Sequence, residues 1–344
     1  MRGSSQIGLG PRFDRSFGLP TASVTSVAVS IALGAFLIGP AAFASASLAS
    51  ANTDLQAGKA DEAITLLHES LQSEPNNPEA NNLLCRVEYT LQQFDQAAGH
   101  CEKAASASPQ NSRYHLWLGR AVGERASRAS FMSAFSLARK TREEFETAVK
   151  LDPHDADALA DLGDFYKEAP GAVGGGTDKA EGVAKQLDAV DPARAHNLRG
   201  EIAEKQKDLA TAEREFKAAI TGSDAAIQWM ELASFYRRHE RWSDMEAAVK
   251  SGEAVAEHDK HAAVALFNGA SILARTNRQL DLAIQLYENY LASPDKTEEA
   301  PAFDALVRLA KLRKQMGDGA GAVREKAAAL ALAREYKPAQ DLKF

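Results

Sequence analysis

The sequence has little of what enzymes and nucleic-acid-binding proteins usually display. Only 7% of its 344 residues are aromatic, only two are cysteines, and no C-x-x-C motif is present. We find no convincing alternation of apolar and polar residues that would predict a half-buried strand. The formal net charge of −7 argues against nucleic acid as the main partner.

Motifs for phosphate, metal or catalysis are incomplete. The glycine-rich stretch at 171–176 lacks the Gly-Lys-Ser/Thr ending and the preceding strand of a phosphate-binding loop. Acidic and histidine residues gather at 152–157 and 258–261 without the spacing of a strong metal site, so we interpret both as polar turns. No spacing suggests a Ser-His-Asp or Cys-His arrangement. We therefore predict no enzymatic activity, no cofactor and no metal, and retain an enzyme with an unrecognised site as the third alternative.

The first 44 residues differ in composition from the rest of the chain. Three arginines open this leader: Arg2, Arg12 and Arg15. An apolar run from Val24 to Ile38 follows, then a Gly-Pro break and small residues, as in a secretory signal cleaved near Ala44 or Ala46. We expect residues 1–44 to be a signal peptide and the protein to be periplasmic or secreted. The alternative is an uncleaved membrane anchor, because residues 24–44 are long enough to cross a bilayer.

Beyond residue 45 a pattern of about 34 residues recurs. Two copies share one spacing of signature residues: Trp229, Leu232, Ala233 and Tyr236, and Leu159, Leu162, Gly163 and Tyr166. Eight times a small residue precedes a larger one by four positions, with Ala63 and Leu67 as the first pair and Ala322 and Lys326 as the last. Prolines at 75, 109, 153 and 192 stand where the first four of these helices should end. The pattern predicts eight helix-turn-helix units stacked as a solenoid.

The spacing of these signature residues resembles that of the tetratricopeptide repeat, and the chain is similar to exported bacterial proteins that carry it. The resemblance implies an all-α, right-handed superhelical solenoid of about eight repeats over residues 45–344. It also implies a non-catalytic scaffold that binds protein or peptide partners on a concave wall made by the first helix of each repeat. The residues it places on that wall are Asn82, Arg86, Tyr89, Trp117, Arg120, Asp164, Asn197, Arg237, Asn268, Arg275 and Lys311.

The resemblance also places the two cysteines opposite each other. Cys85 takes the small-residue position of a first helix, and Cys101 takes the large-residue position of the following second helix. Their side chains should therefore meet, and in an oxidising compartment we expect a disulfide. The alternative is a pair of buried free thiols that act as small apolar side chains.

Two insertions interrupt the repeat, near 126–138 and at 169–177. Both are expected in the turn inside a repeat, on one edge of the solenoid, where extra length is unusual. Seven basic residues and one acid lie between Arg113 and Arg142, with aromatic residues among them. The members that we predict to bind a partner are Arg125, Arg128, Phe131, Arg139 and Lys140. The alternatives are neutral loop drift and arginines that are merely solvated.

The two ends of the solenoid are expected to be solvated caps. The first helix, near residues 47–56, lacks the signature and should be short or frayed. The last helix, from Ala320 to Tyr336, should turn its basic residues to solvent. We predict a scaffold for a protein or peptide at the cell envelope. An alternative is an envelope assembly or transport factor whose basic insertion contacts an anionic glycan or a lipid headgroup.

Overall fold

The computed structural model describes residues 40–221, 223, 225–259 and 262–344. The predicted leader lies outside this part, except for its last five residues, which begin the first helix. Contacts divide the chain into residues 1–39 and a second unit, Pro40–Phe344. Every regular element in the described ranges is helical, which confirms the predicted class. No helix there is both long and apolar enough to span a membrane.

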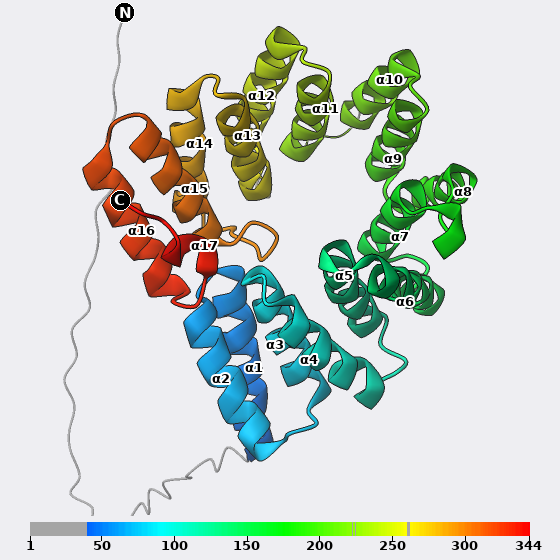
Figure 1. Ribbon diagram of the computed structural model, residues 1–344, viewed down its shortest axis with the longest axis vertical. Coiled ribbons are helices and arrows are strands. Elements are labelled where there is room, and N and C mark those ends of the chain that lie inside the picture. Colours follow the sequence, from blue (N-terminus) through cyan, green and yellow to red (C-terminus); the bar gives the residue numbers. More distant parts are fainter. Residues whose placement is uncertain (1–39, 222, 224, 260–261) are drawn as a thin grey trace, which may run out of the picture. The chain divides into compact units, whose positions relative to one another are not determined.

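Sixteen helices of this unit form eight successive pairs, each with a first and a second helix (Figure 1). The pairs are α1 (Pro40–Gln56) and α2 (Ala60–Ser73), α3 (Pro78–Thr90) and α4 (Phe94–Ala107), α5 (Ser112–Arg128) and α6 (Phe131–Leu151), α7 (Ala156–Glu168) and α8 (Thr177–Leu187), α9 (Pro192–Lys205) and α10 (Leu209–Ile220), α11 (Ala226–Arg238) and α12 (Trp242–Ala256), α13 (Ala263–Thr276) and α14 (Leu280–Ala292), and α15 (Ala302–Gln315) and α16 (Gly319–Leu332). A 3-10 helix, η1 (Gly171–Val173), precedes α8, and α17 (Lys337–Gln340) follows α16. The eight predicted units are therefore confirmed.

Local sequence explains where these helices begin. Asn77 accepts a hydrogen bond from the backbone N–H of Ala80 at 2.9 Å, and Pro78 takes the first helical position, where its missing N–H is not needed. Asp191 caps α9 in the same way, immediately before Pro192. These prolines and caps separate one pair from the next, as the proline spacing predicts.

Small residues let the two helices of a pair approach closely. A Cβ atom at Gly119 of α5 would lie 2.5 Å from the ring of Phe145 on α6, so only glycine fits there. Cys85 on α3 and Cys101 on α4 hold equivalent positions, and a disulfide joins them across Cα atoms 5.3 Å apart. The core thus consists of the small and large residues that the repeat pattern identifies.

The insertion near 126–138 differs from the expected wide turn. Only Ala129 and Ser130 separate α5 from α6, and α6 is 21 residues long. The added residues include four alanines and extend both helices, since alanine has the highest helix propensity. The insertion at 169–177 does form a loop, with Gly174 at φ 97°. This loop contacts α6, because Arg142 Nη1 donates to the carbonyl oxygen of Val173 at 3.1 Å.

The prediction of two solvated end caps is wrong, because the ends of the unit pack on each other (Figure 1). One hydrophobic cluster combines Leu55 and Leu83 from the first two pairs with Phe303 and Tyr336 from the last pair and the residues that follow it. Gly58, at φ 74°, allows the α1–α2 turn to touch α15, since a Cβ there would lie 2.7 Å from the backbone nitrogen of Ala302. The helix α1 is neither short nor frayed. Both ends carry apolar residues that an open solenoid would leave in water.

Candidate functional site

The first helices α3, α5, α7, α9, α11, α13 and α15 face the inside of the curve, and we call the surface they form the inner wall (Figure 1). A pocket of about 840 Å³ lies against α3, α5 and α7. Its other side is formed by Glu298, Glu299 and Pro301, from the connection between α14 and α15, and by Asp304 and Tyr336. The pocket therefore joins the second, third and fourth repeats to the last one.

Four of the predicted binding residues form one block beside this pocket. The guanidinium carbons of Arg86 and Arg120 lie 5.5 Å and 4.7 Å from the centre of the Trp117 ring, and Tyr89 meets the same ring edge-on at 5.6 Å. Cation–π contact holds both arginines in place. Arg86 is 1% exposed and Trp117 is 6% exposed. Direct contact between a partner and these two side chains requires a neighbouring segment to move.

That segment is the loop at 293–301, which we call the inner loop. Its Glu298 accepts hydrogen bonds from Arg86 Nε at 2.9 Å and from Arg86 Nη2 at 2.5 Å. Gln56 donates to Glu298 and also accepts from the Glu298 backbone N–H, both at 3.3 Å. The sequence analysis missed this residue, because nothing in a repeat pattern indicates which loop reaches the inner wall.

Several buried polar atoms near the inner loop have no partner among the described residues. They are Arg86 Nη1, both side-chain polar atoms of Asn82, and Thr297 Oγ1. Such atoms are unfavourable unless they are hydrogen-bonded. The adjacent Glu299 is exposed, and its carboxyl group forms no hydrogen bond or ion pair within the described ranges. Several hydrogen-bond donors and acceptors in this region therefore have no partner among the described residues.

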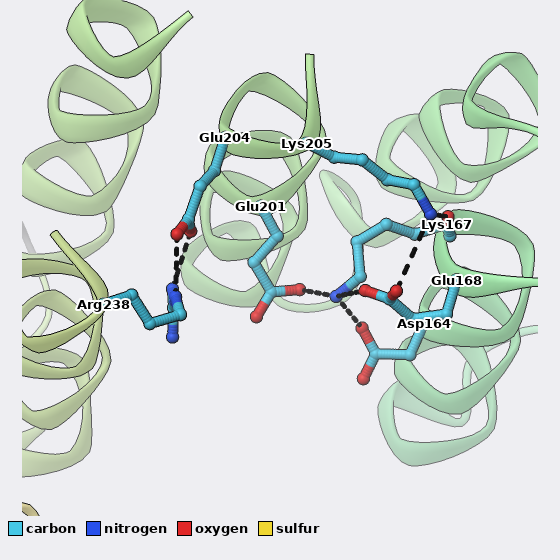
Figure 2. A network of polar contacts seen from close by, with 7 residues as sticks. All are labelled: Asp164, Lys167, Glu168, Glu201, Glu204, Lys205 and Arg238. Atoms are coloured by element: carbon cyan, nitrogen blue, oxygen red, sulfur yellow. Dashed lines mark hydrogen bonds and ion pairs between the residues drawn. The ribbon is translucent and has the colours of Figure 1, made fainter. Parts of the chain in front are cut away.

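Farther along the inner wall, charged residues of α7, α9 and α11 form what we call the charged ladder (Figure 2). Its members are Asp164, Lys167, Glu168, Glu201, Glu204, Lys205 and Arg238. Lys167 Nζ pairs with Asp164 at 2.9 Å and with Glu201, and Arg238 donates two hydrogen bonds to Glu204, at 2.7 Å and 2.8 Å. The ladder bridges three neighbouring repeats through side-chain ion pairs, and Lys205 Nζ also donates to the backbone carbonyl oxygen of Lys167.

Burial and ion pairing shift the pKa values of Glu201 and Lys167 in the charged ladder. Burial raises the pKa of Glu201 to about 7, although the positive charge of Lys167 acts in the opposite direction. The carboxylates of Glu201 and Asp164 in turn hold the pKa of Lys167 above its usual value, even though burial opposes this. Figure 2 shows Lys167 between these two acids.

Beyond the ladder, three of the predicted wall residues have no carboxylate partner in the described part: Arg237, Arg275 and Lys311. They lie on α11, α13 and α15. Burial and then the charge of Arg275 lower the pKa of Arg237, which indicates that the two arginines are close to each other. Asn197, by contrast, is engaged, because it donates to Gln228 Oε1 at 2.6 Å.

The predicted basic cluster lies on the α5–α6 hairpin, and Arg128 among its members also lines the pocket at the inner wall. Most of its charges are paired. Arg125 contacts Asp95 at 2.7 Å, Arg128 contacts Glu124, and Lys140 contacts Glu102. Arg139 instead stacks on Phe135 at 4.6 Å. Phe131 is 86% exposed at the start of α6.

Of the two polar turns considered for metal binding, the one at 152–157 has a local structural role, whereas residues 260–261 of the other lie outside the described residues. Asp155 accepts backbone hydrogen bonds from Asp157 and Ala158 and so caps α7, while Asp157 pairs with Arg194. Within the described ranges, no group of three or more His, Cys, Asp or Glu side chains is placed to hold a metal ion.

Comparison with known proteins agrees with the helical architecture. Residues 54–121 match the family model described as tetratricopeptide repeat. The yeast Tom70 structure is 15% identical, covers 82% of this chain and 57% of its own, and has a TM-score of 0.51. TTC0263, a thermophilic tetratricopeptide repeat protein of Thermus thermophilus, is 20% identical over 52% of this chain and 91% of its own, with a TM-score of 0.45. No curated protein sequence matches the chain.

Proposed function

Because this chain is a tetratricopeptide repeat protein, we propose that it is a non-catalytic scaffold that binds a protein or peptide partner along its inner wall. One observation carries the proposal. The inner loop, a non-helical segment of the chain itself, lies against the wall with Glu298 bound to Arg86. The wall thus accommodates a non-helical segment with an acidic side chain, which is what an external peptide could also present.

The part of the wall that the inner loop leaves open suits a partner that carries carboxylates. Arg237, Arg275 and Lys311 lie on successive first helices without an acidic partner in the described ranges. Neighbouring like charges repel, and an anionic group between them relieves that repulsion. The repeat resemblance implies that a partner binds Arg86 and Trp117. Such binding would require the inner loop to move away first.

Export to the cell envelope of a bacterium is part of this proposal. The leader of residues 1–44 supports it. Cleavage after Ala44 or Ala46 would leave Ala51 and Leu55, the buried apolar residues of α1, in the mature chain. The Cys85–Cys101 disulfide suits an oxidising compartment. The alternative, anchoring through residues 24–44, would place the same solenoid at the membrane.

Site-directed photocrosslinking tests the scaffold function. Asn268 lies on α13, and its position in the sequence falls between Arg237 and Arg275. A photoreactive amino acid at this position should capture a partner in the source organism. Replacing Arg237 and Arg275 together with serine should reduce capture roughly tenfold or more, because a hydrogen bond to a charged group contributes about 1.5–3 kcal/mol. The matched control replaces Lys185 and Lys250, exposed bases of the second helices α8 and α12. Equal capture by both double variants would refute binding at the inner wall.

A second candidate function is an envelope assembly or transport factor that contacts glycan or lipid through the insertion near 126–138. It is favoured by the exposure of Phe131 and Met132 at the tip of the α5–α6 hairpin. Such a role is compatible with partner binding at the inner wall, because the exposed tip residues Phe131 and Met132 do not line the pocket there.

A further inference from the structure

The tip of the α5–α6 hairpin concentrates exposed apolar side chains. Phe131 is 86% exposed, Met132 is 81% exposed and Phe135 is 38% exposed, all within the first five residues of α6. The other large exposed apolar side chains in the described part are Leu209, Met316 and Val323, which are 41–50% exposed and lie outside α5 and α6. An apolar group of this kind at the end of a hairpin indicates an interaction site.

Basic residues accompany the tip, although the chain as a whole is acidic. Residues 125–142 contain five bases and no acid. Arg139 has no carboxylate partner within the described ranges and lies over the ring of Phe135. Arg125, Arg128 and Lys140 do pair with carboxylates, but these pairs are solvent-exposed. Exposed ion pairs contribute little, so a phosphate group can replace the carboxylate at small free-energy cost.

The spacing of the apolar and basic residues along α6 places them at different heights along the helix. Phe131, Phe135 and Arg139 are four residues apart and therefore lie on one face of the helix. At a rise of about 1.5 Å per residue, Arg139 lies roughly 12 Å above Phe131 along the helix. An apolar tip with bases about two turns above it matches a membrane interface, where acyl chains lie beneath phosphate groups.

We propose that this tip, with Phe131 and Met132 leading, inserts into a membrane surface rich in anionic phospholipid while Arg139 and Lys140 contact the lipid phosphates. The proposal rests on the second candidate function and is independent of partner binding at the inner wall. A second copy of the chain fits the tip less well. In a symmetric contact the same bases would face each other, which is unfavourable.

Lipid-depth fluorescence tests the proposal on the full chain. Cys85 and Cys101 are joined to each other, so a cysteine introduced as Met132→Cys takes an environment-sensitive fluorophore selectively. Met316→Cys, at an exposed apolar residue at the end of α15, provides the matched control. Vesicles of equal parts phosphatidylglycerol and phosphatidylcholine are compared with pure phosphatidylcholine. Because each label reports its own surroundings, membrane binding through the leader does not imitate insertion of the tip.

We expect a blue shift and quenching by shallow spin-labelled lipids at position 132 in the anionic vesicles only, and neither at position 316. Adding Phe131→Ser and Arg139→Ala should lower the anionic-vesicle signal at least tenfold. An unchanged spectrum at position 132, or equal shifts at both positions, overturns the proposal. A blue shift without vesicles that grows with protein concentration also overturns it, in favour of self-association. If tip insertion fails while crosslinking at Asn268 persists, the scaffold function stands without a lipid site.

Discussion

Glu298 and Arg86 are 212 positions apart in the sequence and form a two-point ion pair, with Arg86 Nε and Nη2 each donating to the carboxylate. The side chain of Arg86 is 1% exposed and that of Glu298 is 11% exposed. The pair joins α3 of the second repeat to the loop before α15 of the eighth. A solenoid whose ends meet in this way has a long-range contact that ordinary repeat stacking lacks.

Glu298→Gln should lower the free energy of unfolding by roughly 3 kcal/mol, because it leaves a buried guanidinium without a counterion. The control is Glu204→Gln, which weakens the more exposed pair with Arg238 and should change stability by about 1 kcal/mol or less. Denaturant unfolding of both variants measures the difference. Equal, small effects would show that the inner loop does not hold Arg86 in solution.

Tyr336→Ala should destabilise both ends of the solenoid together. The Tyr336 ring packs on Phe303 at 4.7 Å, and its hydroxyl donates to Asp304 and accepts from Gln92. We expect a loss of roughly 3–5 kcal/mol for alanine, since a large cavity forms, and about 1 kcal/mol for Tyr336→Phe. Hydrogen exchange should become faster in α1–α3 and α15–α17 and stay unchanged in α9–α12. Faster exchange only in α15–α17 would contradict closure of the ends.

The sequence predicts the repeats well because each pair of helices is specified locally. Gly119 and Phe145, for example, lie in one unit, and their packing requires only the contact between its two helices. The same locality explains the position of Cys85 and Cys101. The number of repeats and the proline boundaries follow from the same spacing.

Closure of the ends was not predictable from this spacing. It depends on the small rotation between neighbouring helix pairs. These rotations add up over eight repeats, and no single residue in the sequence reveals their total. The one available signal was the apolar character of the ends, where Leu55 and Tyr336 would be poor residues for a solvated cap. The candidate site was predicted in part. Arg86, Tyr89, Trp117 and Arg120 do gather, but their acidic partner Glu298 comes from a loop with no repeat signature.

Loss of the disulfide should destabilise the protein. Cys85 and Cys101 enclose a 16-residue interval, and closing it favours the folded state by about 3 kcal/mol through the entropy of the unfolded chain. Peptide mapping without reductant should recover the two cysteine peptides linked. Reductant should lower the melting temperature of the native chain and leave a Cys85→Ser, Cys101→Ser variant unchanged. Free thiols in freshly isolated protein would refute the bond.

Processing of the leader should leave a mature chain that begins near Ser45 or Ser47. The apolar run and the small residues after it motivate this expectation. N-terminal sequencing of protein isolated from the source organism measures it directly. Recovery of intact Met1 in the membrane fraction would instead identify residues 24–44 as an anchor.

Glu201 should make stability fall as the pH rises toward neutrality. Its pKa in the folded protein is about 7, above the ordinary value of 4.5, so between these values the folded state binds more protons than the unfolded state. Its stabilising contribution is therefore complete below pH 4.5 and is lost as the pH rises through 7. Relative to Glu201→Gln, the native chain should lose on the order of 1–2 kcal/mol of stability between pH 5 and pH 7.

The control is Glu213→Gln. Hydrogen bonds, above all from Arg241, lower the pKa of Glu213 to about 2. The stabilising contribution of Glu213 therefore persists above pH 4.5 and is lost only as the pH falls toward 2. Denaturant unfolding at pH 5, 6 and 7 compares the three chains, and parallel pH profiles for the native chain and Glu201→Gln would show that Glu201 titrates normally.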